Sequence, residues 1–158
     1  MAKRGALRLV LNGAILMLVG MLVGFPGFLF GPPTSMDDEF RLFFRQSHLI
    51  PIAQGAWTIA SGAVLPSLAL SDALASALVW SIIVSDYSIL LAQSAWGIAL
   101  AIGWTEAAGH GVQHSALAPL YLGGLGVTAL GALAGIVLII VGASSALRQM
   151  NCPIRTIH

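Results

Sequence analysis

Four long apolar runs constrain what this chain of 158 residues can fold into. Each run exceeds the roughly 20 residues that a helix needs to cross a bilayer. The composition agrees, because only 8% of the residues are charged, against roughly 25% in soluble domains. The sequence therefore predicts an all-α integral membrane four-helix bundle in which residues 1–158 form a single transmembrane domain. The predicted spans are about 6–30, 42–70, 73–103 and 116–147.

The segments between these runs are too short for a water-soluble domain. One cysteine, Cys152, excludes an internal disulfide and a cysteine-ligated zinc site. Gly123, Gly124 and Gly126 lie inside an apolar run, so they form no phosphate-binding loop or dinucleotide fingerprint. The net charge of +1 gives no sign of a nucleic-acid partner, and we expect none.

Basic residues flank the outer two runs. Lys3, Arg4 and Arg8 stand at the start of the first run, and Arg148 and Arg155 follow the last. The positive-inside rule therefore predicts that both termini are cytoplasmic, in a bacterial-type inner membrane. The first run is longer than a signal-peptide core and has no small-residue cleavage site after it, so we interpret it as a retained helix.

Asp86 is the only charged residue between Ala73 and Thr105. A carboxylate is costly inside a membrane, and such groups usually face a protein interior or cavity and mark a functional site. The same run places Gln93 on the face of Asp86, because seven residues make about two helical turns. Tyr87 and Ser94 share an adjacent face in the same way.

The second run carries a polar stripe of its own, formed by Gln54, Thr58 and Ser61 at helical spacing. A tight turn at Ser71-Asp72 would bring this stripe against the one that contains Asp86. The serines and the threonine favour simple helix packing, since they can bond carbonyls of their own helix. For Asp86 together with His48 we favour a functional role.

Small residues and prolines shape the bundle. Two pairs of glycines spaced by four predict close helix packing, and two prolines in the second run predict kinks or local unwinding. These residues are Gly20 with Gly24, Gly131 with Gly135, and Pro51 and Pro66.

His48 lies within the second run without a second ligand at helical spacing, which suits an axial haem ligand better than zinc. A proton relay with Asp86 is the alternative, although the first and last runs offer no chain of polar partners. His110 and His114 are spaced as a metal-binding pair could be, but solvated loop histidines are the simpler interpretation.

Several segments resemble styrene oxide isomerase, a small four-helix membrane enzyme family, and more distantly hydroxylaminobenzene mutase. The segments that resemble the isomerase are SHLIPIAQG, VLPSLALSD, SIIVSDYSILL and ALAPLYLGGLGV. Two further segments are closer to the mutase: NGAILMLVGMLVG, and the GHG at 109–111 in the third loop, between the third and fourth predicted spans. The resemblance implies a homotrimer with ferric haem b bound between subunits and His48 as axial ligand. It also implies a role in aromatic catabolism, with a small hydrophobic substrate that partitions into the membrane lipid.

In the isomerase family the iron acts as a Lewis acid on an aryl epoxide, and a 1,2-hydride shift after ring opening gives an aldehyde. A dry pocket would protect the electron-poor carbon from water. The resemblance implies this reaction here, with Gln54, Asp86, Tyr87 and Ser94 as candidate catalytic residues. We expect Asp86 to hydrogen-bond Gln54 or the His48 imidazole.

Three positions depart from the family pattern. Gln54 replaces an asparagine, Leu90 replaces a second asparagine, and Ser94 replaces the pocket tyrosine, for which Tyr87 could supply a hydroxyl at another depth. Two alternatives therefore stay open beside the epoxide isomerase. One is a mutase that converts an aryl hydroxylamine to an aminophenol, and the other is a haem-binding membrane protein without catalysis.

Overall fold

The computed structural model describes the backbone of residues 2–30, 38–102 and 115–151. It describes the side chains of residues 2–23, 41–102 and 115–151. Four described helices are long and apolar enough to cross a membrane, which confirms the predicted all-helical, four-span architecture. The predicted homotrimer stays a prediction. The elements are α1 (Ala2–Phe30), α2 (Asp38–Val64), the short 3₁₀ helix η1 (Leu65–Ser67), α3 (Asp72–Ala101) and α5 (Ala118–Asn151).

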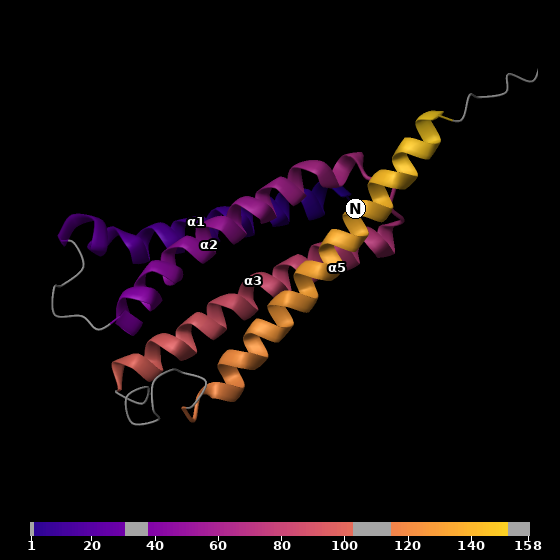
Figure 1. The fold of residues 1–158 in the computed structure, drawn as a ribbon. Helices are drawn as coiled ribbons and strands as arrows, with labels where there is room; N and C mark the ends of the chain where they lie inside the picture. The colour runs from indigo at the N-terminus through magenta and orange to yellow at the C-terminus, as the bar shows by residue number, and fades with distance from the viewer. Residues whose placement is uncertain (1, 31–37, 103–114, 152–158) are drawn as a thin grey trace, which may run out of the picture.

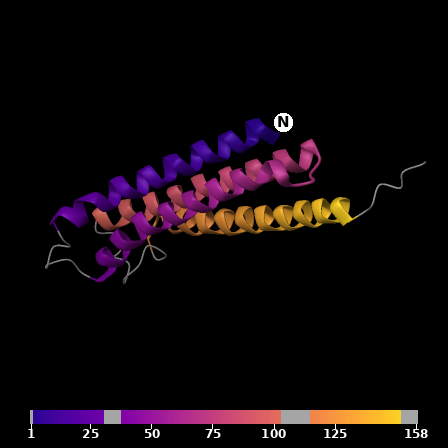
Figure 2. The same ribbon diagram turned by 90° about the horizontal axis from the view of Figure 1, so that it is seen from above.

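The helices associate as two antiparallel pairs. α1 packs mainly against α2 and α3 mainly against α5, while α1 and α2 each make smaller contacts with α3 (Figure 1). In Figure 2 the four helices lie side by side, with their axes roughly aligned and their chain directions alternating. α1 begins at the end of the bundle that holds η1 and the start of α3, and α5 runs past this end.

Glycine allows the backbones of α1 and α2 to meet. A Cβ atom added to either Gly13 or Gly55 would lie 2.5 Å from the carbonyl oxygen of the other residue. The predicted packing roles of Gly20, Gly131 and Gly135 are confirmed, since an added Cβ at each would meet a neighbouring helix. Small residues thus set how closely each helix pair can pack.

The two prolines of the second span behave differently. Pro51 lies inside α2, whereas α2 ends at Val64 and Pro66 falls in η1. The predicted local unwinding therefore occurs at Pro66, because proline has no backbone N–H and its ring collides with the preceding turn. α3 then begins at the predicted turn, with the Ser71 hydroxyl accepting a 3.4 Å hydrogen bond from the Leu74 N–H.

Apolar clusters occupy both ends of the bundle. The cluster at the η1 end is built around fully buried Leu9, Leu78 and Ile82. The cluster at the other end is built around Trp96 and Ala99, with Phe43 and Tyr121 packed against them. The buried polar residues of α3, which are Ser85, Asp86 and Gln93, lie between these two clusters.

Candidate functional site

A buried hydrogen-bonded pair joins α2 to α3. The Thr58 hydroxyl lies 3.1 and 3.0 Å from the two carboxylate oxygens of Asp86 and donates to them. Both side chains are almost fully buried, with exposed fractions of 0% and 1%. The polar stripes of the second and third spans therefore meet, as the sequence predicts.

A second polar path continues from this contact into α5. The Gln54 amide donates to the Ser85 hydroxyl at 3.3 Å and also interacts with the Asp86 carboxylate. The Ser85 hydroxyl donates to the Thr128 carbonyl at 2.9 Å, and the Thr128 hydroxyl shares its proton between the Gly124 carbonyl at 2.8 Å and the Ser85 carbonyl at 3.2 Å. The pair Thr58–Asp86 is thus flanked by hydrogen bonds that connect three helices.

Two buried side-chain atoms, close in sequence to these residues, have no hydrogen-bond partner among the described residues. They are the Ser61 hydroxyl oxygen and the Gln93 amide oxygen. Buried polar atoms of this kind usually bond ordered water or another ligand. The interior between the helices therefore retains hydrogen-bonding capacity beyond the pairs already described.

One ring nitrogen of His48 is held by a hydrogen bond within its own helix. Its Nδ1 lies 2.9 Å from the Phe44 carbonyl oxygen. A carbonyl only accepts hydrogen bonds, so this contact requires a proton on Nδ1, and in the neutral imidazole the lone pair is then on Nε2. Proteins usually orient a metal-binding histidine by a hydrogen bond at the ring nitrogen that does not bind the metal. The half-buried imidazole therefore fits the axial role predicted for it.

His48 and Asp86 do not meet. Thr58, the partner of Asp86, follows His48 by ten residues on α2, which corresponds to about 15 Å along the helix axis. No hydrogen bond joins His48 to Asp86 among the described residues, whereas the expected contact of Asp86 with Gln54 is present. Asp86 thus acts on the α2–α3 contact and not on the imidazole.

Tyr87 and Ser94 lie on the outer face of α3, away from the buried carboxylate. The Tyr87 hydroxyl donates to the Asn12 side-chain oxygen on α1 at 3.1 Å, and the Tyr87 side chain is 55% exposed. The Ser94 hydroxyl donates to the Leu90 carbonyl of its own helix at 2.8 Å. The four predicted catalytic residues therefore divide into an inner pair, half-buried Gln54 and buried Asp86, and an outer pair.

Aromatic rings line the same end of the bundle as His48. Phe43 meets Trp96 edge to face with centroids 5.3 Å apart, and Trp96 meets Tyr121 at 6.0 Å. The Phe44 ring lies 5.9 Å from the imidazole of His48. The side chains at this end of the bundle are therefore largely apolar and aromatic. The histidine pair His110 and His114, together with Trp104 and Cys152, lies outside the described residues.

Thr58, which the sequence assigns to helix packing, bonds Asp86 because both side chains are buried and face each other. Three further polar contributors were not assigned from the sequence. Ser85 and Thr128 join α3 to α5, and Asn12 joins α1 to α3. A usable signal existed for Asn12 and Thr128, since each is a polar side chain within the largely apolar first or last span.

The fold and site define a four-helix membrane protein with a buried, hydrogen-bonded carboxylate and a half-buried imidazole. Residues 6–144 match the family model of styrene oxide isomerase. This match covers most of the chain, and the protein belongs to that family. No curated protein and no solved structure matches the chain.

Proposed function

We propose that this protein is a haem-dependent membrane isomerase that converts a small aryl epoxide to an aldehyde by ring opening and a 1,2-hydride shift. Family membership supports the isomerase activity. The observation that carries the haem assignment is the Nδ1 contact of His48 with the Phe44 carbonyl, which leaves Nε2 available. His48 would hold ferric haem b through that nitrogen. The bound iron would supply a Lewis acid for the epoxide oxygen.

The residues around His48 would prepare the pocket. The hydrogen bond to Phe44 fixes the rotation of the imidazole, and the ring of Phe44 packs beside it. Phe43 and Trp96 contribute apolar surface at the same end of the bundle. Such surroundings exclude water, which would otherwise attack the electron-poor carbon during ring opening.

Asp86 and Thr58 would act as positioning residues. Asp86 is almost fully buried in a single chain and is bonded by Thr58, so neither oxygen is presented at the surface. Their contact fixes α2 against α3 and thereby holds Gln54, one turn from Thr58, in place. We expect Asp86→Asn to lower haem occupancy and turnover, and unchanged values of both would contradict this role.

The outer face of α3 bears on substrate choice. Ser94 stands where the family has a tyrosine, and its hydroxyl bonds the carbonyl of Leu90. Leu90 itself stands where the family has an asparagine. The chain therefore offers fewer free polar groups at these positions, which favours an epoxide with few polar substituents.

Absorption spectra of detergent-purified protein test the haem assignment. We expect a Soret band in the wild type that His48→Ala abolishes and His114→Ala retains. A band that survives His48→Ala but disappears in His114→Ala would identify His114, and not His48, as the haem ligand. A wild type that takes up no supplied haem would contradict the proposal.

Product analysis then separates the reactions. We expect the wild type to turn an aryl epoxide into the aldehyde and His48→Ala to lose this activity. Formation of an aminophenol from an aryl hydroxylamine, with no aldehyde from the epoxide, would assign the mutase reaction. Haem binding without turnover of either substrate would assign the non-catalytic alternative.

The homotrimer is part of the same proposal. α5 is the least buried of the four spans, and nothing lies within 4 Å of a Cβ added at Gly123 or Gly126. Exposed small residues allow another helix to approach closely, so α5 suits contact with a second copy. Mass measurement of the protein with its detergent subtracted tests the trimer, and a monomer with full activity would contradict it.

Both termini are proposed to be cytoplasmic. The described cations at the η1 end of the bundle are Lys3, Arg4, Arg8 and Arg148, which fits the positive-inside rule. Labelling of cysteines introduced near either terminus in intact cells tests this orientation.

A further inference from the structure

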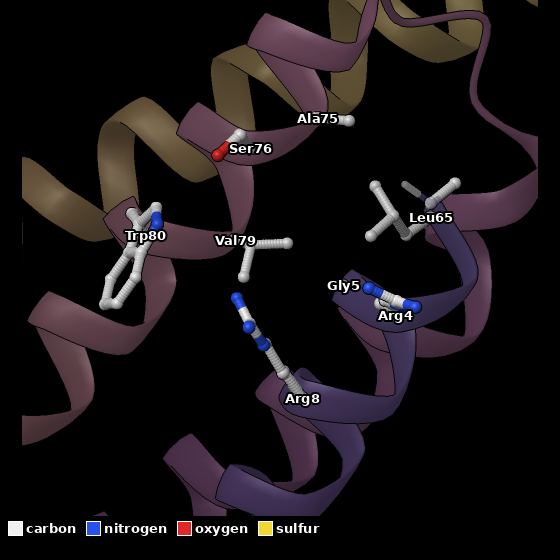
Figure 3. Close-up of a pocket in the computed structure, with 9 residues that line it drawn as sticks. Arg4, Gly5, Arg8, Leu65, Ala75, Ser76, Val79 and Trp80 are labelled. Atoms are coloured by element: carbon white, nitrogen blue, oxygen red, sulfur yellow. The ribbon is translucent and has the colours of Figure 1, made fainter.

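A cavity of about 170 Å³ lies between α1 and α3 at the η1 end of the bundle. Figure 3 shows Arg8 reaching from α1 toward Val79 and Trp80 of α3, with Arg4 beside Leu65. None of the residues of the proposed haem and substrate site lines this cavity. It therefore calls for an explanation of its own.

The cavity is positively charged. Arg4 and Arg8 are four residues apart on α1, so both guanidinium groups project from one face of the helix. None of the described residues that line the cavity is acidic. Guanidinium groups bind phosphate oxygens with paired, directional hydrogen bonds. The charge and geometry of the cavity therefore favour a phosphate group, with the Ser76 hydroxyl as a further donor.

The other walls of the cavity are apolar. Leu65 and Val79 are buried, with exposed fractions of 2% and 5%. Trp80 is 55% exposed, and Val84, one turn further along α3, is 46% exposed. A free inorganic anion would leave this exposed apolar wall without a partner. A ligand with both a phosphate and a hydrocarbon chain matches both kinds of surface.

The depth of the cavity agrees with this ligand. α3 has 30 residues and is about 45 Å long, so it extends about 7 Å past each side of a roughly 30 Å hydrocarbon core. That overhang is about five residues, which places Ser76 near the core boundary. Arg8, the seventh residue of the 29-residue α1, lies at a similar depth. Tryptophan is enriched at this boundary, where lipid phosphates lie just outside.

We propose that this cavity binds an anionic phospholipid, with its phosphate between Arg4 and Arg8 and an acyl chain along Trp80 and Val84. The lipid fills the groove between α1 and α3 and ties the two helix pairs together at this end. This site is separate from the haem site, so it stands or fails independently of the proposed isomerase activity.

Thermal unfolding in mixed micelles tests the site. We expect phosphatidylglycerol to raise the unfolding temperature of the wild type more than an equal mole fraction of phosphatidylcholine does. The double variant R4Q/R8Q should lose this difference and bind the anionic lipid about thirtyfold more weakly, since each arginine near a membrane surface contributes about fivefold. The control K3Q/R148Q removes two charges at the same end outside the cavity and should keep the difference.

Three results would overturn the proposal. An unchanged lipid effect in R4Q/R8Q would exclude these arginines as ligands. An equal loss in R4Q/R8Q and K3Q/R148Q would reduce the effect to general surface charge. A stabilisation by inorganic phosphate equal to that by phosphatidylglycerol would assign the cavity to a free anion.

Fluorescence quenching provides a measurement that does not depend on the arginine variants. Brominated acyl chains quench a tryptophan that they contact, and Trp80 lies on the proposed path of the chain. We expect brominated phosphatidylglycerol to quench the wild type more than brominated phosphatidylcholine, and W80F to lose this excess. An excess that persists in W80F would place the acyl chain elsewhere and contradict the proposal.

Discussion

The α1–α2 and α2–α3 interfaces are held together by different forces. Between α1 and α2, glycines such as Gly13 and Gly55 bring two backbones into direct contact. Between α2 and α3, the contact is smaller and combines buried polar pairs, above all Thr58 with Asp86, with the ring contact of Phe43 and Trp96. In lipid, where apolar surfaces gain little by meeting each other, close packing and hydrogen bonds are the two remaining sources of helix association.

The difference assigns distinct tasks to the two interfaces. Close glycine packing fixes a helix pair over its whole length, but it offers no chemical group for a site. The polar interface fixes a few side chains at a defined depth, and Gln54 and Asp86, the inner candidates of the proposed active site, both belong to it. α2 takes part in both interfaces, and it also carries His48.

Gly55→Val should have the largest effect on stability. A Cβ at this position would lie 2.5 Å from the Gly13 carbonyl oxygen and 2.6 Å from Cγ of Met17, so α1 and α2 would have to separate. We expect a loss of about 3 kcal/mol or more in unfolding free energy, since overpacking against backbone cannot relax. Unfolding in detergent monitored by circular dichroism measures the loss.

Ala56→Val is the matched control for that substitution. It places the same side chain on the adjacent, exposed position of the same helix. We expect little change there, and equal losses in both variants would show that valine itself, and not the contact with Gly13, weakens the helix.

Thr58→Val should rank second. The substitution keeps the shape of the side chain but removes the hydroxyl that donates to Asp86, so the buried carboxylate loses a partner. We expect a loss of about 1–2 kcal/mol, in the range found for polar contacts between membrane helices. Thr58→Ser retains the donor and should lose much less, and the same loss in both variants would refute the hydrogen bond as the cause.

Ser85→Ala should cost about 0.6 kcal/mol, the average for a hydrogen bond inside a membrane protein. The Ser85 hydroxyl joins Gln54 of α2 to the Thr128 carbonyl of α5, so its loss weakens a link between helices. Ser81→Ala is the control, because the Ser81 hydroxyl bonds only the Leu78 carbonyl of its own helix among the described residues. A control that loses as much as Ser85→Ala would remove the distinction between the two kinds of bond.

The sequence predicted the four spans and the meeting of the two polar stripes, because apolar length and helical spacing can be counted directly. It also placed Gln54 and Thr58 on one face, from which their contacts with α3 follow. The partners of Ser85 and Tyr87 were not predictable in the same way. A serine can bond its own helix or a neighbour, and only the arrangement of the helices in space decides which helix lies beside Tyr87.

The smallest effect is expected for the pair Tyr87–Asn12, which sharpens the comparison between buried and exposed polar contacts. Its hydrogen bond of 3.1 Å is as short as the buried one of Thr58, but Tyr87 is 55% exposed, and Asn12 also donates to the Arg8 carbonyl of its own helix. We expect a coupling energy below about 0.5 kcal/mol in a double-mutant cycle of Tyr87→Phe and Asn12→Ala, because Asn12 keeps its bond to the Arg8 carbonyl when the bond to Tyr87 is lost. A coupling as large as that of Thr58 with Asp86 would mean that this outer face of α1 and α3 is shielded in the assembled protein. The stability of the site would then depend on what covers that face as well as on the helix interior.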